Sequence, residues 1–241
     1  MVPSQVKQNF EVSADRANPI RDMFNAVAPR YDFLNRLLSA GCDKYWRKIA
    51  VDELEPVANR VFLDVATGTG DIAFEIRKKY KSKIIGLDLS INMLEIAKQK
   101  AKNKKIEDIK FIEGDAENLP FEDNTFDKVL ISYGLRNLGD TEKGIEEFYR
   151  VLKPGGAVGV LEFFQPQSTI MSNLFKLYFN YILPWVASLF SNSKAYRYLP
   201  ESVENFITPN ELSILFNKVG FQKIKSRNMS FGITTILNAQ K

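Results

Sequence analysis

Short apolar runs alternate with amphipathic stretches through the central part of the chain. The apolar runs are nearly continuous, which is typical of strands buried on both faces of a parallel sheet. They predict strands at residues 60–64, 83–88, 109–113, 126–132 and 157–162. Between them, apolar positions at helical spacing predict helices at residues 70–79, 92–98 and 141–152, and residues 153–156 form a Pro-Gly-Gly turn. This alternation predicts an α/β fold with helices on both faces of the sheet.

A helical pattern precedes these elements. Apolar residues recur at helical spacing from Pro19, and Pro29 is expected to interrupt the helix. A second apolar face covers residues 31–41, and a further helix is predicted over 43–54. Such aromatic stripes favour a layer that covers one sheet edge, and the alternative is half of a substrate pocket. We expect one domain over residues 1–241 that has an N-terminal helical cap at 1–58.

Polar side chains stand where the predicted strands end. The carboxyl ends of parallel strands meet at one edge of a sheet, which is where ligands bind in folds of this kind. Because a sheet core needs no polar groups there, their convergence predicts a binding site. The residues concerned are Asp64, Asp88, Asp115, Ser132 and Glu162.

A glycine-rich turn follows the first strand. Its sequence, Gly68-Thr-Gly70-Asp-Ile-Ala73, fits the dinucleotide pattern G-x-G-x-x-[GA], so NAD must be considered. Asp71, however, puts a carboxylate where a pyrophosphate would meet the helix N-terminus, and Asp64 adds a second negative charge. Such a turn favours a ligand that has no phosphate and a cationic end, as S-adenosylmethionine has. An NAD oxidoreductase and a non-catalytic nucleotide-binding protein remain the alternatives.

Three further positions would complete this cofactor site. Asp88 would accept hydrogen bonds from the two ribose hydroxyls, unless it serves only as a helix N-cap. Asp115 can accept from the adenine amine, and Ala116 offers a backbone N–H. With Asp64, Gly68 and Gly70 of the turn, these residues form the predicted cofactor site.

Composition excludes several kinds of chemistry. The chain has 241 residues, of which 45% are hydrophobic and 26% charged, as in an ordinary globular protein. It has no histidine and one cysteine, Cys42, which excludes Ser-His-Asp and Cys-His catalysis and an intrachain disulfide. We expect no metal. A net charge of +4 is too small to indicate nucleic acid. Because residues 1–10 lack a secretory apolar core, we expect a cytoplasmic protein.

Long stretches of the chain resemble the quinone-biosynthesis C-methyltransferases, which methylate demethylmenaquinol or a polyprenyl benzoquinol. The resemblance runs from about residue 20 and is carried by residues 31–46, 134–137, 150–163 and 198–202. Two positions depart from the family pattern. Asp43 stands where the family has His, and Phe164 stands where it has Ser.

The resemblance implies a class I S-adenosylmethionine-dependent methyltransferase with a seven-stranded Rossmann-like sheet. An antiparallel C-terminal hairpin would lie near residues 221–225 and 232–238. By position, the family also implies cofactor contacts from Thr69 and Ser132. The implied reaction moves a methyl group from S-adenosylmethionine to a ring carbon of a prenylated quinol, with demethylmenaquinol the favoured acceptor. The alternatives are a ubiquinone-pathway benzoquinol and another small apolar acceptor.

Methylation of an aromatic carbon requires an electron-rich ring, preferably a phenolate. Arg136 could stabilise that phenolate or hold a basic water, and Asn137 could hydrogen-bond the ring oxygen. Arg136 could instead form only a structural ion pair. Tyr31 completes the predicted catalytic set, and Asp32 and Tyr198 are alternates.

Residues 169–190 are the most apolar long stretch of the chain. A transmembrane helix is not expected here, because Lys176 lies in the middle of the stretch. The longest run free of Lys and Asn, residues 181–191, is also too short to span a bilayer. We expect a helical insertion over 165–205 that caps the substrate edge, either as a buried helix pair or with aromatics that accept the prenyl tail or rest on a membrane. Peripheral contact with the inner membrane and homodimer formation are left open.

Overall fold

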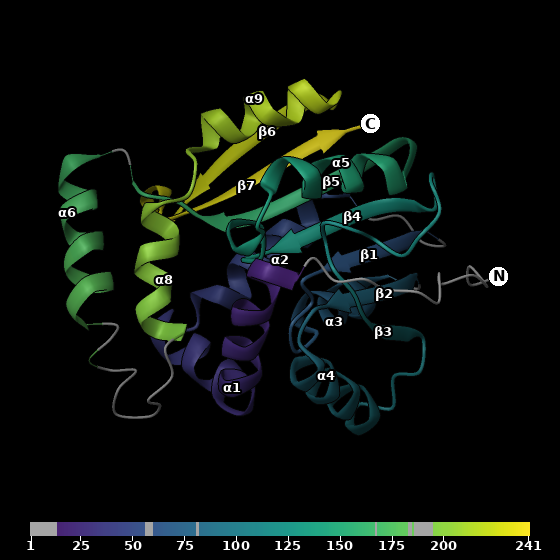
Figure 1. The fold of residues 1–241 in the computed structure, drawn as a ribbon, viewed down its shortest axis with the longest axis horizontal. Coiled ribbons are helices and arrows are strands. Elements are labelled where there is room, and N and C mark those ends of the chain that lie inside the picture. Colours follow the sequence, from purple (N-terminus) through teal and green to yellow (C-terminus); the bar gives the residue numbers. More distant parts are fainter. Residues whose placement is uncertain (1–13, 56–59, 81, 167, 183–184, 186–194) are drawn as a thin grey trace.

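The computed structural model describes residues 14–55, 60–80, 82–166, 168–182, 185 and 195–241 (Figure 1). Seven strands form one sheet in the order β3-β2-β1-β4-β5-β7-β6. The strands are β1 Val61–Val65, β2 Lys83–Asp88, β3 Ile109–Glu113, β4 Phe126–Ser132, β5 Leu152–Phe163, β6 Gln222–Met229 and β7 Thr234–Gln240. The first five run parallel, whereas β7 runs antiparallel to β5 and β6. This is the predicted sheet with its C-terminal hairpin.

Helices cover both faces of the sheet because its side chains alternate between two apolar cores. Phe62 on β1 belongs to one core, and the next residue, Leu63, belongs to the other; both are fully buried. The first core is covered by α2 Cys42–Glu53, α3 Asp71–Lys79 and α4 Ile91–Asn103. The second is covered by α5 Thr141–Val151 and α9 Pro209–Val219.

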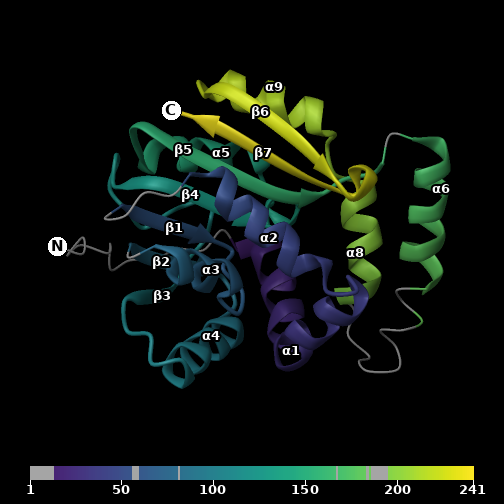
Figure 2. The same cartoon turned by 180° about the vertical axis from the view of Figure 1, so that it is seen from behind.

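The remaining helices gather at the carboxyl ends of the parallel strands (Figures 1 and 2). They are α1 Ala14–Leu38, α6 Thr169–Leu177, η2 Tyr178–Ile182 and α8 Ala195–Glu204, joined by the short turns η1 Leu135–Asn137 and η3 Ser230–Gly232. A third apolar core lies among them, built on Leu34, Phe175 and Phe179. None of the described helices is both long and apolar enough to cross a bilayer.

Two local predictions were wrong. Pro29 does not interrupt the first helix: α1 is continuous through both Pro19 and Pro29. Because Ala28 and Leu34, on either side of Pro29, are buried, tertiary packing holds the helix despite the missing N–H. The Lys153–Gly156 turn does not precede β5 but lies inside it, where the register with β4 shifts and Gly155 adopts a positive φ of 77°.

Candidate active site

Two cavities lie side by side where α1 crosses the carboxyl ends of the strands, and they share Phe24, Tyr31 and Tyr133. We call the first the strand-end cavity because Gly68, Asp88, Asp115, Ala116 and Ser132 line it. The second, the cap cavity, has a volume of about 300 Å³ and is lined mostly by apolar side chains of α1, α2, η2 and α8. The topology thus separates a cavity that has several polar side chains from a more apolar one.

The strand-end cavity is built around Asp88, the last residue of β2. Its carboxylate accepts hydrogen bonds from the backbone N–H groups of Gly68, at 2.7 Å, and Ser90, at 2.8 Å. Burial raises the pKa of Asp88 to about 6, although these hydrogen bonds act in the opposite direction. Ser90, rather than Asp88, caps α4, because its side chain accepts from the N–H of Met93. The N-cap alternative for Asp88 is therefore wrong.

Three residues that line this cavity carry a buried side-chain oxygen with no hydrogen-bond partner among the described residues. These atoms are Oγ of Ser132, Oδ1 of Asn137 and Oη of Tyr133, the last on the wall shared with the cap cavity. An unpaired buried polar atom is costly, so a polar ligand would stabilise such atoms. Asn137 was predicted to meet the acceptor ring, but it lines the strand-end cavity and donates from Nδ2 to the carbonyl of Tyr133, at 3.2 Å.

Asp64, Thr69 and Gly70 line neither cavity but belong to the strand end and the glycine turn beside them. Asp64 is buried and accepts from the Thr67 hydroxyl and from the N–H of Ala73. Burial raises the pKa of Asp64 to about 7. Thr69 donates to Asp32, at 2.5 Å. For these three predicted residues, direct contact with the cofactor stays a prediction.

Gly70 is required at the start of α3 for two reasons. Its φ of 86° is left-handed, and a Cβ there would lie 3.0 Å from Phe74 and 3.1 Å from Phe111. Gly41 precedes α2 with a similar φ of 79°, but a Cβ there would meet nothing within 4 Å. Alanine substitutions at Gly41 and Gly70 therefore distinguish the cost of backbone strain alone from the added cost of steric overlap.

We expect Gly41→Ala to lower the free energy of unfolding by about 1 kcal/mol, since only the backbone is strained. Gly70→Ala should cost about 1–3 kcal/mol more, because the added methyl group overpacks the two rings. Urea unfolding of both variants measures the difference. Equal losses would show that the close contacts at Gly70 relax freely.

A cluster of buried charges joins the turn to the N-terminal helices. Asp71, the first residue of α3, pairs with Arg36 at 2.5 Å, Lys100 at 2.8 Å and Arg47 at 3.7 Å. Burial would raise the pKa of Asp71, but Arg47, Lys100 and Arg36 outweigh it and hold the pKa below its usual range. Protein cations therefore neutralise the Asp71 carboxylate, which was predicted to disfavour a pyrophosphate at this turn.

Asp43, which replaces the His of the family pattern, is the second acidic centre of this cluster. Its buried carboxylate pairs with Arg36 and Arg47 and accepts from the Ser39 hydroxyl at 3.0 Å. One carboxylate thereby fixes two guanidinium groups that also reach the glycine turn. Asp43 ties α1 and α2 to the start of α3.

Asp43→Ala should lower the free energy of unfolding by about 3–5 kcal/mol, because Arg47 then stays buried without its nearest carboxylate. A matched control is Lys48→Ala, which removes an exposed pair with Asp52 on the same helix and should cost less than about 1 kcal/mol. Urea unfolding measures both. A loss below about 1 kcal/mol for Asp43→Ala would mean that water or Asp71 replaces the carboxylate.

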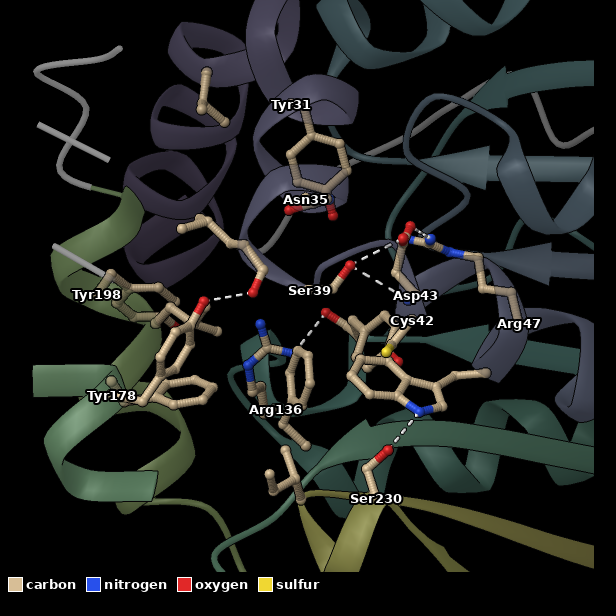
Figure 3. A pocket seen from close by; sticks show the side chains of 18 of the residues that line it. Tyr31, Asn35, Ser39, Cys42, Asp43, Arg47, Arg136, Tyr178, Tyr198 and Ser230 are labelled. Atoms are coloured by element: carbon tan, nitrogen blue, oxygen red, sulfur yellow. Dashed lines mark hydrogen bonds and ion pairs between the residues drawn. The ribbon is translucent and has the colours of Figure 1, made fainter. Parts of the chain in front are cut away.

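The cap cavity contains Arg136, Tyr31 and Tyr198 of the predicted catalytic residues, but not Asp32 (Figure 3). Asp32 instead accepts from Thr69 and pairs with Lys100 at 2.8 Å, so it belongs to the charge cluster. Tyr31 forms part of the wall between the two cavities. Burial raises the pKa of Tyr31, with Arg47 acting against it, so the hydroxyl stays protonated at neutral pH.

Arg136 reaches the cap cavity from η1 and is held on three sides. Nη1 donates to Glu162 at 2.5 Å and to the Tyr133 carbonyl at 2.8 Å, while Nε donates to the Ser202 hydroxyl at 3.2 Å. Glu162 is fully buried, and its carboxylate also accepts the N–H groups of Phe163 and Arg136. Among the described residues no hydrogen bond uses Nη2, so this nitrogen can donate to a ligand in the cavity.

Several residues of the cap cavity escaped the sequence prediction. Trp46 donates to the Ser230 hydroxyl at 3.0 Å and packs edge-on against Phe163, with ring centroids 6.0 Å apart. Arg47 lies over the ring of Tyr133, 5.6 Å from its centroid. Ser202 positions Arg136. Trp46 and Ser202 lie in the stretches 31–46 and 198–202 that resemble the family, so the resemblance could have indicated them as site residues.

No group of His, Cys, Asp and Glu side chains within the described part of the chain could hold a metal ion. The site thus consists of a cavity with several polar side chains at the strand ends, a more apolar cavity beside it, and a buried guanidinium that lines the second cavity. With the sheet order 3-2-1-4-5-7-6, this is the fold of the class I S-adenosylmethionine-dependent methyltransferases. Asp88 and the unpaired atoms of Ser132 and Asn137 fit the hydroxyl and amine groups of that cofactor.

The chain belongs to the ubiE/COQ5 methyltransferase family, whose model matches residues 11–241. It is 41% identical over 230 residues to the ubiquinone/menaquinone biosynthesis C-methyltransferase UbiE of Geotalea daltonii, covering 94% of this chain and 98% of that protein. It is 44% identical over 216 residues to the demethylmenaquinone methyltransferase of Thermus thermophilus, covering 89% and 97%.

Solved structures share the fold at low sequence identity. The [4+2]-cyclase SpnF has a TM-score of 0.71 at 18% identity, covering 97% of this chain and 98% of that one. A Haemonchus contortus phosphoethanolamine N-methyltransferase in complex with S-adenosyl-L-methionine has a TM-score of 0.63 at 18% identity, covering 81% and 52%. These likenesses establish the fold alone, since one fold supports different reactions.

Proposed function

We propose that this enzyme methylates a ring carbon of a prenylated quinol, with demethylmenaquinol as its first acceptor. The observation that carries the proposal is the position of Arg136 (Figure 3). Its guanidinium points into the apolar cap cavity, which shares Tyr31 and Tyr133 with the strand-end cavity. An apolar ring with an ionisable hydroxyl directed at the guanidinium fits such a cavity. The names of the relatives in Geotalea daltonii and Thermus thermophilus support the same acceptor class.

S-adenosylmethionine supplies the methyl group, which leaves the sulfur without the bonding electron pair and accepts a pair from the ring carbon. Asp88 would accept the ribose hydroxyls, and Asp115 and Ala116 would bind the adenine. Ser132 and Asn137 would bind remaining polar groups through Oγ and Oδ1. The chain itself holds the two substrates so that ring carbon and methyl group meet at the shared wall.

Arg136 would stabilise the phenolate form of the acceptor. Its Nη2 can donate to the phenolate oxygen, while Glu162 and Ser202 hold the guanidinium in place. The apolar walls formed by Trp46, Phe163 and other cap residues exclude water, which favours a reaction whose charges cancel. Tyr31, at the shared wall, would orient the ring. After methylation the ring carbon transfers its proton to a solvent water, the C–H bonding pair returns to the ring, and the ring becomes aromatic again.

The cap segments also belong to this proposal. Within the predicted N-terminal cap at 1–58, the described residues 14–55 would cover the site, since α1 and α2 provide many of the cap-cavity walls. Within the predicted insertion at 165–205, Phe179 and Tyr198 would close its far side. The rest of both predicted segments, residues 1–13, 56–58, 167, 183–184 and 186–194, lies outside the described residues. Together they would form the substrate half of a single methyltransferase domain.

A methyl-transfer assay with labelled S-adenosylmethionine tests the proposal directly. Reduced demethylmenaquinol and reduced demethyl benzoquinol should be compared, with each oxidised quinone as the control. We expect turnover with the reduced naphthoquinol and none with either oxidised form, since a quinone ring is too electron-poor to attack. Turnover with the benzoquinol alone would support the ubiquinone-pathway alternative. Absence of turnover with both quinols would refute quinol methylation and leave another apolar acceptor.

A further inference from the structure

The helix α6 and its continuation η2 are apolar on two opposite faces. Phe175 and Phe179 are buried against the cap core, where their rings stack with centroids 3.9 Å apart. On the other side, Ile170, Leu174, Leu177 and Tyr181 are 75%, 53%, 52% and 70% exposed. Ile170, Leu174 and Leu177 follow the i, i+4, i+7 spacing of one α-helical face. Tyr181 follows four residues later in the π-helical turn η2 and continues the stripe. We call it the outer stripe.

An exposed apolar stripe is costly for a protein that stays in water throughout its cycle. Figures 1 and 2 show α6 at one end of the molecule, beyond α8 and away from the sheet. Trp185, a residue type enriched at membrane interfaces, follows η2 and is 65% exposed. The outer stripe therefore belongs to the outer surface of the cap.

The helix that carries the outer stripe has a basic side chain and no acidic one. α6 and η2 contain Lys176 and no Asp or Glu, whereas the exposed Glu201 and Glu204 lie on α8. Lys176 is exposed on α6 itself. Basic and apolar side chains combined on one interfacial helix are typical of binding to anionic lipid surfaces. A second copy would bring like charges together, and four side chains are few against the roughly 20–30 residues that each partner of a stable protein interface contributes.

The small volume of the cap cavity provides a functional reason for an apolar outer surface beside it. Its volume of about 300 Å³ lies at the small end of ligand pockets, so the ring of a prenylated quinol fills it and a long tail must leave the protein. Phe179 and Tyr178 line the cavity on one face of the helix whose other face carries the outer stripe. A tail leaving beside this helix would remain in the lipid on which the helix rests.

We propose that the outer stripe is a membrane-docking face that binds the anionic lipid surface holding the acceptor. The biological role of this docking rests on the proposed function, but the binding to lipid itself does not depend on methyl transfer. Docking places the mouth of the cap cavity at the lipid surface, so the quinol ring enters without its tail crossing water.

Flotation with lipid vesicles tests the docking face. The probes are vesicles of phosphatidylcholine with phosphatidylglycerol, and vesicles of phosphatidylcholine alone. The full chain should float with the anionic vesicles and be partly released by salt. Leu174→Glu should weaken flotation at least tenfold, and Leu174→Glu/Leu177→Glu should abolish it. Ile214→Glu, on α9 with 61% exposure, makes the same charge change elsewhere and should float like the unmodified chain.

The same variants separate docking from catalysis. With a quinol that carries one short prenyl unit in solution, Leu174→Glu should keep full turnover, because the outer stripe lies outside the cavities. With a long-tailed quinol in vesicles its turnover should fall at least tenfold. Flotation without any methyl transfer would refute the proposed function and leave docking intact. Methyl transfer by a chain that does not float would overturn the docking proposal. So would a chain that does not float but sediments as a dimer, if Leu174→Glu dissociates that dimer.

Discussion

Asp88→Ala is expected to weaken binding of S-adenosylhomocysteine by about 100-fold or more. The variant would lack the two charge-assisted hydrogen bonds between the Asp88 carboxylate and the ribose hydroxyls, each worth about 1.5–3 kcal/mol. A loss of about 1.4 kcal/mol corresponds to a tenfold change in affinity. Titration calorimetry measures the dissociation constant. Asp127→Asn is the control, because that carboxylate binds Arg60 and the N–H of Val61 at the opposite ends of the strands. A loss below tenfold for Asp88→Ala would move the ribose away from Asp88.

The pH dependence of the same binding has a definite sign. Burial raises the pKa of Asp88 to about 6, so the free protein carries a proton there below that pH. Only the ionised carboxylate offers acceptors at both oxygens, and the affinity should therefore fall as the pH drops through 6, by up to about tenfold per unit. Asp88→Asn should bind weakly with a flatter profile. An unchanged slope in that variant would assign the titration to another group, such as Asp64.

The sheet was predictable because its strands are buried on both faces. Predicted strands 83–88, 109–113 and 126–132 coincide with β2, β3 and β4. Polar residues at the strand ends also located the strand-end cavity, since parallel topology brings Asp88, Asp115 and Ser132 together whatever the loops do. Local pattern and global fold agree in these elements.

The charge cluster and the division of side chains between the two cavities were beyond sequence reasoning. Asp71 lies next to Arg36 only because α1 folds back over the glycine turn, a contact between residues 35 positions apart. Asn137 and Arg136 are neighbours in the chain, yet the short turn η1 sends their side chains into different cavities. Periodicity describes single elements, so it carries no information on how two elements cross.

Arg136→Ala should lower the turnover of the reduced quinol by about 100- to 1,000-fold and leave the affinity for S-adenosylhomocysteine unchanged. Removing one donor that stabilises a developing or existing oxyanion has an effect of this size. Its pH–rate profile should also shift to higher pH, because without the guanidinium the quinol hydroxyl ionises less readily. Single-turnover kinetics at several pH values measure both effects. Equal turnover in the variant and the unmodified enzyme would remove Arg136 from the reaction.

A loss of folding must be distinguished from a loss of chemistry in this experiment. Arg136→Ala leaves Glu162 buried without its cation, which costs about 3–5 kcal/mol. Arg136→Lys keeps a cation beside Glu162 but cannot also donate from a second arm, so it should fold, bind the cofactor and still turn over at least tenfold more slowly. Arg150→Ala removes another ion-paired arginine, on α5, and should keep full turnover. If Arg136→Lys were fully active, the arginine would serve only to neutralise Glu162.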